Sequence, residues 1–275
     1  MRFTKMQSLG NDYIFVDAIN QKIKAAPELS VRLCDRHYGV GSDGLVLICP
    51  SEAADFRMRI FNPDGTEAEI CGNALRSMAK YVYDFGLTRK REVNIETLAG
   101  VRTMYLTVRN GRAEMIRGDL RAPVLEAEKI PVLTGKEFFI GQSVEAAGRE
   151  FKVTAVSMGN PHAVVFTDDV QSLDISIYGP ALEKHRLFPK RTNVEFARVA
   201  DRHNIRMRAW ERGTGETLAC ATGSCASAVA GVLNGLCERS VTVHQIGGRI
   251  EVEWDDKSGS VFMTGPSAWV FDGEI

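Results

Sequence analysis

The sequence predicts an α+β fold made of two pseudo-symmetric, strand-rich halves that arose by internal duplication. Short segments of the first half recur in the second at a constant separation of 149 residues, from Asn11 to Asn160 (160 − 11) and from Cys71 to Cys220 (220 − 71). A gapless repeat over roughly 60 positions is typical of two copies of one supersecondary unit. Each cysteine stands between a polar turn and a helical pattern. A pseudo-twofold axis relating the copies would bring both cysteines to one central cleft.

The first copy opens with a strand that runs into a Ser-x-Gly-Asn turn, where glycine supplies backbone angles that other residues avoid. An alternating strand, a helical stretch, an Arg-Met-Arg strand and a polar turn then lead to Cys71 and its helix. Gly86 marks the C′ position of that helix. The elements are expected at Phe3–Met6, Ser8–Asn11, Tyr13–Asp17, Leu29–Arg36, Arg57–Arg59, Asn62–Gly65 and Leu75–Val82.

The second copy repeats this order as far as Cys220. The helix after it is small and apolar on all sides over Ala226–Leu233, so it should be fully buried. Hairpins close the two copies, marked by Asn110-Gly111 and by Asp255–Gly259. The other elements are expected at Val153–Val156, Ser157–Asn160, Ala163–Phe166, Ala181–Arg186, Arg206–Arg208 and Glu211–Gly215.

The closing strands match at nearly the same separation, Gly118 with Gly265. The segment after Gly118 leads into the second half, so by symmetry the segment after Gly265 should return to the first. We therefore expect a discontinuous N-terminal half, residues 1–118 with 266–275, and a C-terminal half, residues 119–265. Each half should be a curved sheet around one central helix, with the active site in the cleft between them.

The composition favours a cytoplasmic enzyme. The chain has 275 residues, 44% of them apolar, and a net charge of −1 with no basic stripe, so no nucleic-acid partner is indicated. No apolar run is long enough to span a membrane, and the N-terminal segment lacks the apolar core of a secretory signal. The six cysteines form no Cys-x-x-Cys pair and no ligand spacing with histidine, which indicates neither a metal site nor disulfides. Cysteines without disulfide bonds are typical of proteins in a reducing compartment.

The placement of Cys71 and Cys220 favours proton transfer at a carbon atom. At a helix N-terminus, unpaired N–H groups and the helix dipole favour negative charge, which lowers the pKa of a thiol. The same N–H groups can bind a substrate carboxylate and stabilise the charge formed when the adjacent carbon loses its proton. One cysteine would act as thiolate base and the other as thiol acid, and they would exchange roles for the opposite stereoisomer.

The remaining cysteines are expected to be buried packing residues, since a lone cysteine is more often a small hydrophobe than a catalyst. They are Cys34, Cys49, Cys225 and Cys237. His162, which follows a turn, would by itself also be structural. The arginines of the two Arg-Met-Arg strands are interpreted as a solvated face.

Six motifs give the chain a specific resemblance to the diaminopimelate epimerase family, from residue 3 to the C-terminal Gly-Glu-Ile. They are Gly10–Asp12, Asn62–Gly65, Glu69–Asn73, Gly159–His162, Thr192–Phe196 and Trp210–Cys220. The resemblance implies an isomerase that interconverts LL- and meso-2,6-diaminopimelate without a cofactor, in lysine and peptidoglycan precursor synthesis. Diaminopimelate is then the small-molecule partner, and a homodimer is expected.

The resemblance also implies a role for each matching residue. Cys71 and Cys220 would be the acid/base pair, with His162 supporting them and Glu211 holding the reacting ammonium group. The reacting carboxylate would be held by Gly72, Asn73, Ala221 and Thr222. The distal amino acid end would be held by Asn62, Asn160, Asn193 and Arg212, and Asn11 would line the pocket. An arginine fork suits a remote carboxylate, and amides suit zwitterionic ends.

Two positions depart from the family pattern. The usual Cys-Gly-Thr-Gly is Cys220-Ala221-Thr222-Gly223 here, so Ala221 must adopt backbone angles compatible with a Cβ atom. Gly44 stands where a pocket glutamine is common. Both departures leave room for a related amino acid with a second polar end.

Several other functions share part of this pattern. A proline racemase or hydroxyproline epimerase would use two cysteines, but it would not need Glu211-Arg212 and three asparagines for a distal amino acid end. A phenazine-biosynthesis-type isomerase would not be expected to keep both cysteines. A non-catalytic amino acid binding protein gives no reason for symmetric cysteines at helix N-termini. A pyridoxal-phosphate racemase is disfavoured because no lysine stands in a phosphate-binding context.

Overall fold

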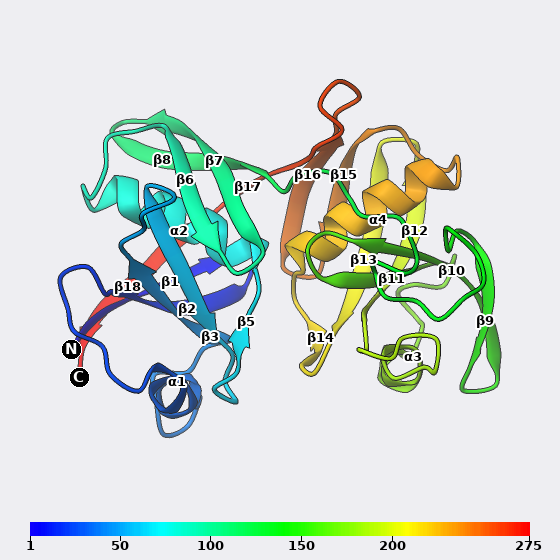
Figure 1. Ribbon diagram of the computed structural model, residues 1–275, viewed down its shortest axis with the longest axis horizontal. Helices are drawn as coiled ribbons and strands as arrows, with labels where there is room; N and C mark the ends of the chain where they lie inside the picture. Colours follow the sequence, from blue (N-terminus) through cyan, green and yellow to red (C-terminus); the bar gives the residue numbers. More distant parts are fainter. The chain divides into compact units, whose positions relative to one another are not determined.

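A computed structural model describes residues 1–275 as a mixed, strand-rich α/β protein with four helices. The chain divides into two compact units (Figure 1). Unit 1 consists of Met1–Asp119 and Thr264–Ile275, and unit 2 of Leu120–Met263. The two chain ends lie side by side in unit 1, where the N–H of Ile275 donates to the carbonyl of Met1 at 3.0 Å. Unit 1 is therefore discontinuous in sequence.

The strands of unit 1 form one ladder in the order β18-β1-β2-β3-β4-β6-β7-β8. The pairs β2–β3 and β4–β6 are parallel, and the other pairs of this ladder are antiparallel. The short strand β5 pairs with β4. The bounds are β1 Arg2–Ser8, β2 Asn11–Asp17, β3 Gly44–Cys49, β4 Phe56–Phe61, β5 Glu67–Ala68, β6 Glu92–Thr97, β7 Gly100–Arg109, β8 Arg112–Asp119 and β18 Ala268–Glu274.

Unit 2 repeats this ladder in the order β9-β10-β11-β12-β13-β15-β16, with β11–β12 and β13–β15 parallel and the short strand β14 on β13. The bounds are β9 Gln142–Ala146, β10 Arg149–Ser157, β11 Pro161–Phe166, β12 Asn193–Asp201, β13 Asn204–Glu211, β14 Gly215–Thr217, β15 Ser240–Gln245 and β16 Gly248–Trp254; β17, Val261–Pro266, returns the chain to unit 1. The two ladders share the same alternation of antiparallel and parallel pairs, which is what an internal duplication produces.

Equivalent side chains repeat as well. The guanidinium group of Arg59 binds Glu67 through two hydrogen bonds of 2.8 and 2.9 Å. At the equivalent position of unit 2, Arg208 binds Glu216 at 2.8 and 3.1 Å. The Arg-Met-Arg strands thus carry one fork-shaped ion pair each, rather than only solvated arginines.

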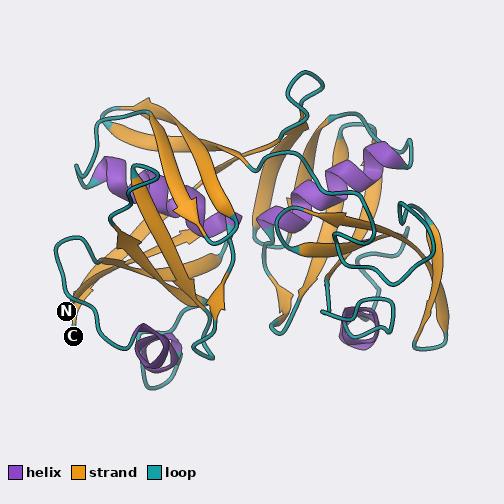
Figure 2. Cartoon of the chain, in the orientation of Figure 1, coloured by secondary structure: helices purple, strands orange, loops and turns teal.

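One long helix in each unit is surrounded by strands of its own ladder (Figure 2). Helix α2, Gly72–Asp84, packs against β1, β2, β6, β7 and β8. Helix α4, Ala221–Leu233, packs against β10, β11, β12, β13, β15 and β16. The first eleven residues of α4 are buried, and Val232 and Leu233 are half-buried. The burial expected over Ala226–Leu233 is therefore confirmed except at its last two residues. Gly86 has a left-handed φ of 78°, as expected just beyond the end of α2.

The shorter helices differ from the expected ranges. Helix α1 spans Ala26–Cys34 rather than Leu29–Arg36, and α3 spans Ile175–Glu183 rather than Ala181–Arg186. The side chain of Asp174 caps α3 by accepting the N–H of Ser176 at 3.1 Å. Pro180 lies inside this helix. Because proline usually interrupts a helix, the sequence places the start of the helix after Pro180 and not at Ile175.

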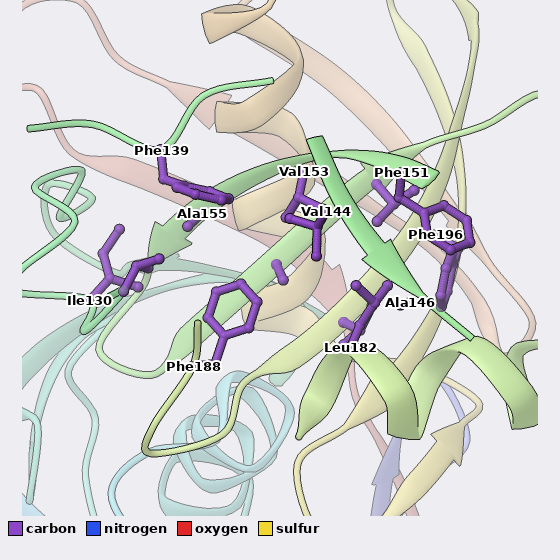
Figure 3. Close-up of a cluster of buried hydrophobic side chains, with 14 of the residues drawn as sticks. Ile130, Phe139, Val144, Ala146, Phe151, Val153, Ala155, Leu182, Phe188 and Phe196 are labelled. Carbon is purple, nitrogen blue, oxygen red and sulfur yellow. The ribbon is translucent and has the colours of Figure 1, made fainter. Parts of the chain in front are cut away.

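Part of the outer face of each ladder is also covered. In unit 1, Ile14 and Val16 pack with Leu33 of α1, while Phe15 faces the other way and stacks on Tyr81 of α2. In unit 2, a cluster over β9, β10 and α3 includes Phe139, Phe188 and other residues shown in Figure 3. Strands with both faces covered have nearly continuous apolar sequences, as β3 shows. None of the four helices is long and apolar enough to cross a membrane.

Candidate active site

Cys71 caps helix α2 of unit 1. Its backbone is extended and the helix begins at the next residue, Gly72. The sulfur accepts a hydrogen bond from the N–H of Ala74 at 3.5 Å, and the carbonyl oxygen accepts one from the N–H of Leu75 at 2.9 Å. The sulfur thus takes up one of the N–H groups that a helix leaves without an internal partner. The prediction that Cys71 stands at a helix N-terminus is confirmed.

Two amide side chains connect Cys71 to the Ser-x-Gly-Asn turn. Nδ2 of Asn73 donates to Oδ1 of Asn11 at 3.0 Å, and the Cys71 sulfur lies 3.7 Å from the same oxygen. Nδ2 of Asn11 donates to Oδ2 of Asp43 at 2.7 Å, which fixes Asn11 with its oxygen toward the cysteine. Four of the five expected site residues of unit 1 therefore lie together: Asn11, Cys71, Gly72 and Asn73.

Asn62, the fifth, lies in the turn between β4 and β5. Its Nδ2 donates to Oγ1 of Thr66 at 2.9 Å, and its carbonyl oxygen accepts from Oγ of Ser30 at 2.8 Å. None of these hydrogen bonds reaches the Cys71 helix. The Asn62 amide closes its own turn, and one of its N–H groups remains for another partner.

Cys220 has the same capping position at α4. Its sulfur accepts from the N–H of Gly223 at 3.3 Å and lies 3.6 Å from the hydroxyl of Thr222. The thiol is buried, at 5% exposure, whereas Cys71 is half-buried. Ala221, the first helical residue, is not among those with a positive φ, so alanine fits where the family pattern has glycine.

His162 is fully buried beside this helix and pairs with Glu195. Its Nδ1 lies 2.7 Å from Oε1 of Glu195, and its Nε2 lies 3.0 Å from Oδ1 of Asn160. Nδ2 of Asn160 in turn donates to Oγ1 of Thr222 at 3.3 Å. A Cβ atom on Gly223 would lie 2.5 Å from Oε1 of Glu195, so only glycine allows the helix to approach the carboxylate this closely.

The residues expected to hold the substrate in unit 2 form a second connected group. Oδ1 of Asn193 accepts the N–H of Arg212 at 2.8 Å, and its Nδ2 donates to the carbonyl of Pro161 at 3.0 Å. Oε1 of Glu211 accepts from the hydroxyl of Thr217 at 2.6 Å. The Asn193 amide therefore joins the Gly-Asn-Pro-His turn to the backbone of Arg212.

The surroundings of Cys220 favour its neutral form. Burial raises the pKa of the Cys220 thiol well above its usual value, and the carboxylates of Glu211 and Glu195 raise that pKa further. Hydrogen bonds from Thr222 and Gly223 act in the opposite direction and are outweighed. The helix N-terminus therefore acts on Cys220 in the expected direction, but desolvation and two negative charges exceed its effect and the net pKa is raised.

Three residues in these groups had no role assigned from the sequence. Tyr13 places its hydroxyl 3.2 Å from the Cys71 sulfur, Glu195 holds His162, and Oε1 of Gln245 accepts the N–H of Cys220 at 2.7 Å. The 149-residue separation pairs Tyr13 with His162, which is the one signal that pointed to Tyr13. Among the cysteines interpreted as packing residues, Cys34, Cys225 and Cys237 are buried and Cys49 is half-buried.

Comparison with known proteins identifies relatives over the whole chain. A family model described as diaminopimelate epimerase matches residues 3–122 and 154–270. A diaminopimelate epimerase of Acetivibrio thermocellus is 53% identical over 275 residues, covering 100% of this chain and 98% of the relative. One from Methanococcus maripaludis strain C5 is 50% identical, with 100% and 99% covered.

Solved structures of lower identity share the fold. A probable proline racemase from Agrobacterium radiobacter, solved with bound carbonate, has a TM-score of 0.74 at 16% identity, covering 100% of this chain and 92% of the other. A phenazine biosynthesis protein of the PhzF family from Bacillus anthracis has a TM-score of 0.68 at 18% identity, covering 100% and 98%. At this identity the likeness describes the fold and not the substrate.

Proposed function

This chain belongs to the diaminopimelate epimerase family and is an isomerase with diaminopimelate epimerase activity, and we propose that Cys71 and Cys220 are its acid and base. The reaction interconverts LL- and meso-2,6-diaminopimelate at one α-carbon. One cysteine removes the α-proton from one face, and the other delivers a proton to the opposite face. The observation that carries this proposal is the shared capping position of the two sulfurs at equivalent helices.

The two sulfurs start from different protonation states. Burial and two carboxylates favour the thiol at Cys220, so Cys220 is the acid of the resting enzyme and Cys71 the base. When Cys71 takes the α-proton, the electron pair left on the carbon delocalises into the adjacent carboxylate. Protonation from Cys220 then completes the inversion, and the two cysteines have exchanged their protonation states.

The helix N-termini stabilise the charge that develops. In the proposal the backbone N–H groups of Gly72, Asn73, Ala221 and Thr222 hold the reacting carboxylate. Charge builds up on that carboxylate only while the proton is absent, so N–H groups aimed at it lower the barrier selectively. The electron sink is the substrate's own carboxylate, which the backbone N–H groups stabilise, and the proposed chemistry requires no cofactor.

The remaining residues select the substrate. Glu211 holds the reacting ammonium group. Its carboxylate contributes to the raised pKa of the Cys220 thiol, which supports a position of Glu211 beside the reacting carbon. Arg212 binds the distal carboxylate, with Asn62, Asn160 and Asn193 at the distal amino acid end. Asn193 fixes the Arg212 backbone by accepting its N–H. Asn11 lines the pocket next to Cys71, and His162 supports the cysteines.

We expect the enzyme to be a homodimer. Strand β18 pairs with β1 and carries three consecutive exposed apolar residues, Trp269, Val270 and Phe271. Exposed apolar runs of this kind are typical of interaction surfaces. Light scattering should give the mass of a dimer for the wild type and of a monomer for Phe271→Glu, and a monomeric wild type would contradict the expectation.

The function is tested by hydrogen exchange at the substrate. LL-diaminopimelate is incubated with the purified protein in deuterium oxide, without added cofactor, and followed by NMR. The proposal predicts loss of an α-proton signal together with appearance of the meso isomer. A folded protein that produces neither change would overturn it.

A further inference from the structure

Tyr13 is held against Cys71 by the ladder of unit 1. It lies on β2, two residues after Asn11, and is 7% exposed. Side chains two residues apart on a strand share a face, so Tyr13 and Asn11 both point toward the start of helix α2. The hydroxyl oxygen of Tyr13 lies 3.2 Å from the Cys71 sulfur. This is within hydrogen-bonding distance for an oxygen and a sulfur.

The missing side chain of Gly44 makes room for the Tyr13 ring. Gly44 is the partner of Tyr13 in the parallel pairing of β2 and β3. A Cβ atom on Gly44 would lie 2.8 Å from Cε1 of Tyr13 and 2.7 Å from the carbonyl oxygen of Phe61. The Tyr13 ring also makes an edge-to-face contact with Phe15, at 6.5 Å between ring centres. Gly44 and Tyr13 are therefore one structural feature, in which an aromatic ring occupies the space above a glycine.

The duplication gives Tyr13 a counterpart. Its equivalent 149 residues further on is His162, whose ring contacts Glu195 and Asn160. The two halves thus place different polar groups at the same position. A phenol donates a hydrogen bond but does not act as a base at neutral pH, because its ordinary pKa is about 10. The half that carries Cys71 therefore has a donor where the other half has an imidazole.

Three neighbours of the Cys71 sulfur within unit 1 can be ranked by distance and chemistry. The Ala74 N–H at 3.5 Å donates to the sulfur, and the Tyr13 hydroxyl at 3.2 Å is able to donate to it. Hydrogen bonds donated to the sulfur stabilise a thiolate. Oδ1 of Asn11 at 3.7 Å is an acceptor, because the amide nitrogen is bonded to Asp43, and it favours a thiol. The hydroxyl is the nearest of the three.

We propose that the Tyr13 hydroxyl donates a hydrogen bond to the Cys71 sulfur and keeps it in the thiolate form in the resting enzyme. Tyr13 is a positioning residue in this account, since it acts through Cys71 and not on the substrate. The role given to the thiolate rests on the proposed function, in which Cys71 is the base. At Cys220 the nearest hydroxyl, that of Thr222, is more distant at 3.6 Å, and the neighbouring carboxylates favour the thiol.

The test is the pH dependence of Cys71 alkylation in the absence of substrate. Wild type and Tyr13→Phe are treated with iodoacetamide over a pH series, and modification of the Cys71 peptide is quantified by mass spectrometry. Tyr13→Phe keeps the ring above Gly44 and removes one oxygen. The alkylation midpoint should move to higher pH, with a roughly tenfold lower rate at neutral pH, as expected for the loss of a hydrogen bond to a charged group. A change in access to the sulfur would alter the plateau rate but not the midpoint.

Two comparisons make the result specific. Tyr105→Phe removes a hydroxyl from the partly exposed Tyr105 of β7, and its Cys71 profile should coincide with that of the wild type. Protein in which tyrosine is replaced by 3-fluorotyrosine carries a more acidic phenol, and its Cys71 midpoint should move to lower pH. This variant also serves if Tyr13→Phe fails to fold.

Different results would overturn the role of Tyr13 and the proposed function. A Cys71 profile unchanged in Tyr13→Phe and in the fluorinated protein would overturn the role of Tyr13, whatever the epimerase activity. A wild type that leaves diaminopimelate unchanged would overturn the proposed function and would not alter the alkylation profiles.

Discussion

The imidazole of His162 and the carboxylate of Glu195 form a fully buried pair, with Nδ1 2.7 Å from Oε1. The contact with Glu195 on Nδ1 and the contact with Asn160 on Nε2 together fix the orientation of the imidazole ring. Oε2 of Glu195 has no hydrogen-bond partner. A buried carboxylate with one unsatisfied oxygen costs stability, which indicates that the pair is kept for the site.

Glu195→Gln should reduce kcat by roughly one to two orders of magnitude with a smaller change in KM. The amide has the same shape but lacks the charge that orients His162 and can present an N–H group to Nδ1. Steady-state kinetics measures the effect. Glu150→Gln, the same change at an exposed position of β10, should leave both constants unchanged. Equal kcat values in Glu195→Gln and wild type would show that His162 needs no partner.

The raised pKa of Cys220 leads to a prediction for Glu211. Because the Glu211 carboxylate contributes to that raised pKa, Glu211→Gln should lower the pKa of the Cys220 thiol. The thiolate of Cys220 should then form at lower pH than in the wild type, which alkylation of the Cys220 peptide over a pH series would measure. Glu216→Gln, which removes a carboxylate bound to Arg208, serves as the control. A profile moved to higher pH would contradict the assigned cause.

Much of the fold could be predicted because the duplication repeats it. The opening strands of each half, the Arg-Met-Arg strands and the two capping cysteines follow from local patterns that occur twice. The burial of α4 follows from its own small apolar sequence. Helix α3 begins earlier than its expected range because Asp174 caps it and Pro180 lies within it. Local sequence is a weak guide where a helix is stabilised mainly by packing.

Only those site residues that lie in a recognisable sequence motif could be predicted. Glu195 is 33 residues from His162, and Gln245 is 25 residues from Cys220, so both contacts depend on strand pairing. The pairing of Tyr13 with Gly44 depends on the register of β2 and β3. The raised pKa of Cys220 also depends on burial and on carboxylates brought from other strands, which the helix position alone does not reveal.

The proposed role of Arg212 in binding the distal carboxylate is tested with Arg212→Lys. The variant keeps the charge but loses the fork that binds a carboxylate through two parallel hydrogen bonds. kcat/KM for diaminopimelate should fall by roughly one to three orders of magnitude, equivalent to about 1.5 to 4 kcal/mol. Background turnover of an amino acid without a distal carboxylate should fall much less. Arg198→Lys, at an exposed position of β12, is the matched control. Equal losses on both substrates would place Arg212 at the reacting end or in the fold.

The central claim is that one sulfur serves each face of the α-carbon, and epimerisation by Cys71→Ser and Cys220→Ser tests it most directly. A hydroxyl is a far weaker base than a thiolate at neutral pH, so each variant should lose epimerase activity by roughly 10³-fold or more while keeping its fold. Each should still eliminate halide from one stereoisomer of a halogenated diaminopimelate, because that reaction needs the base on one face only. Near wild-type epimerisation by either serine variant would contradict the two-cysteine mechanism.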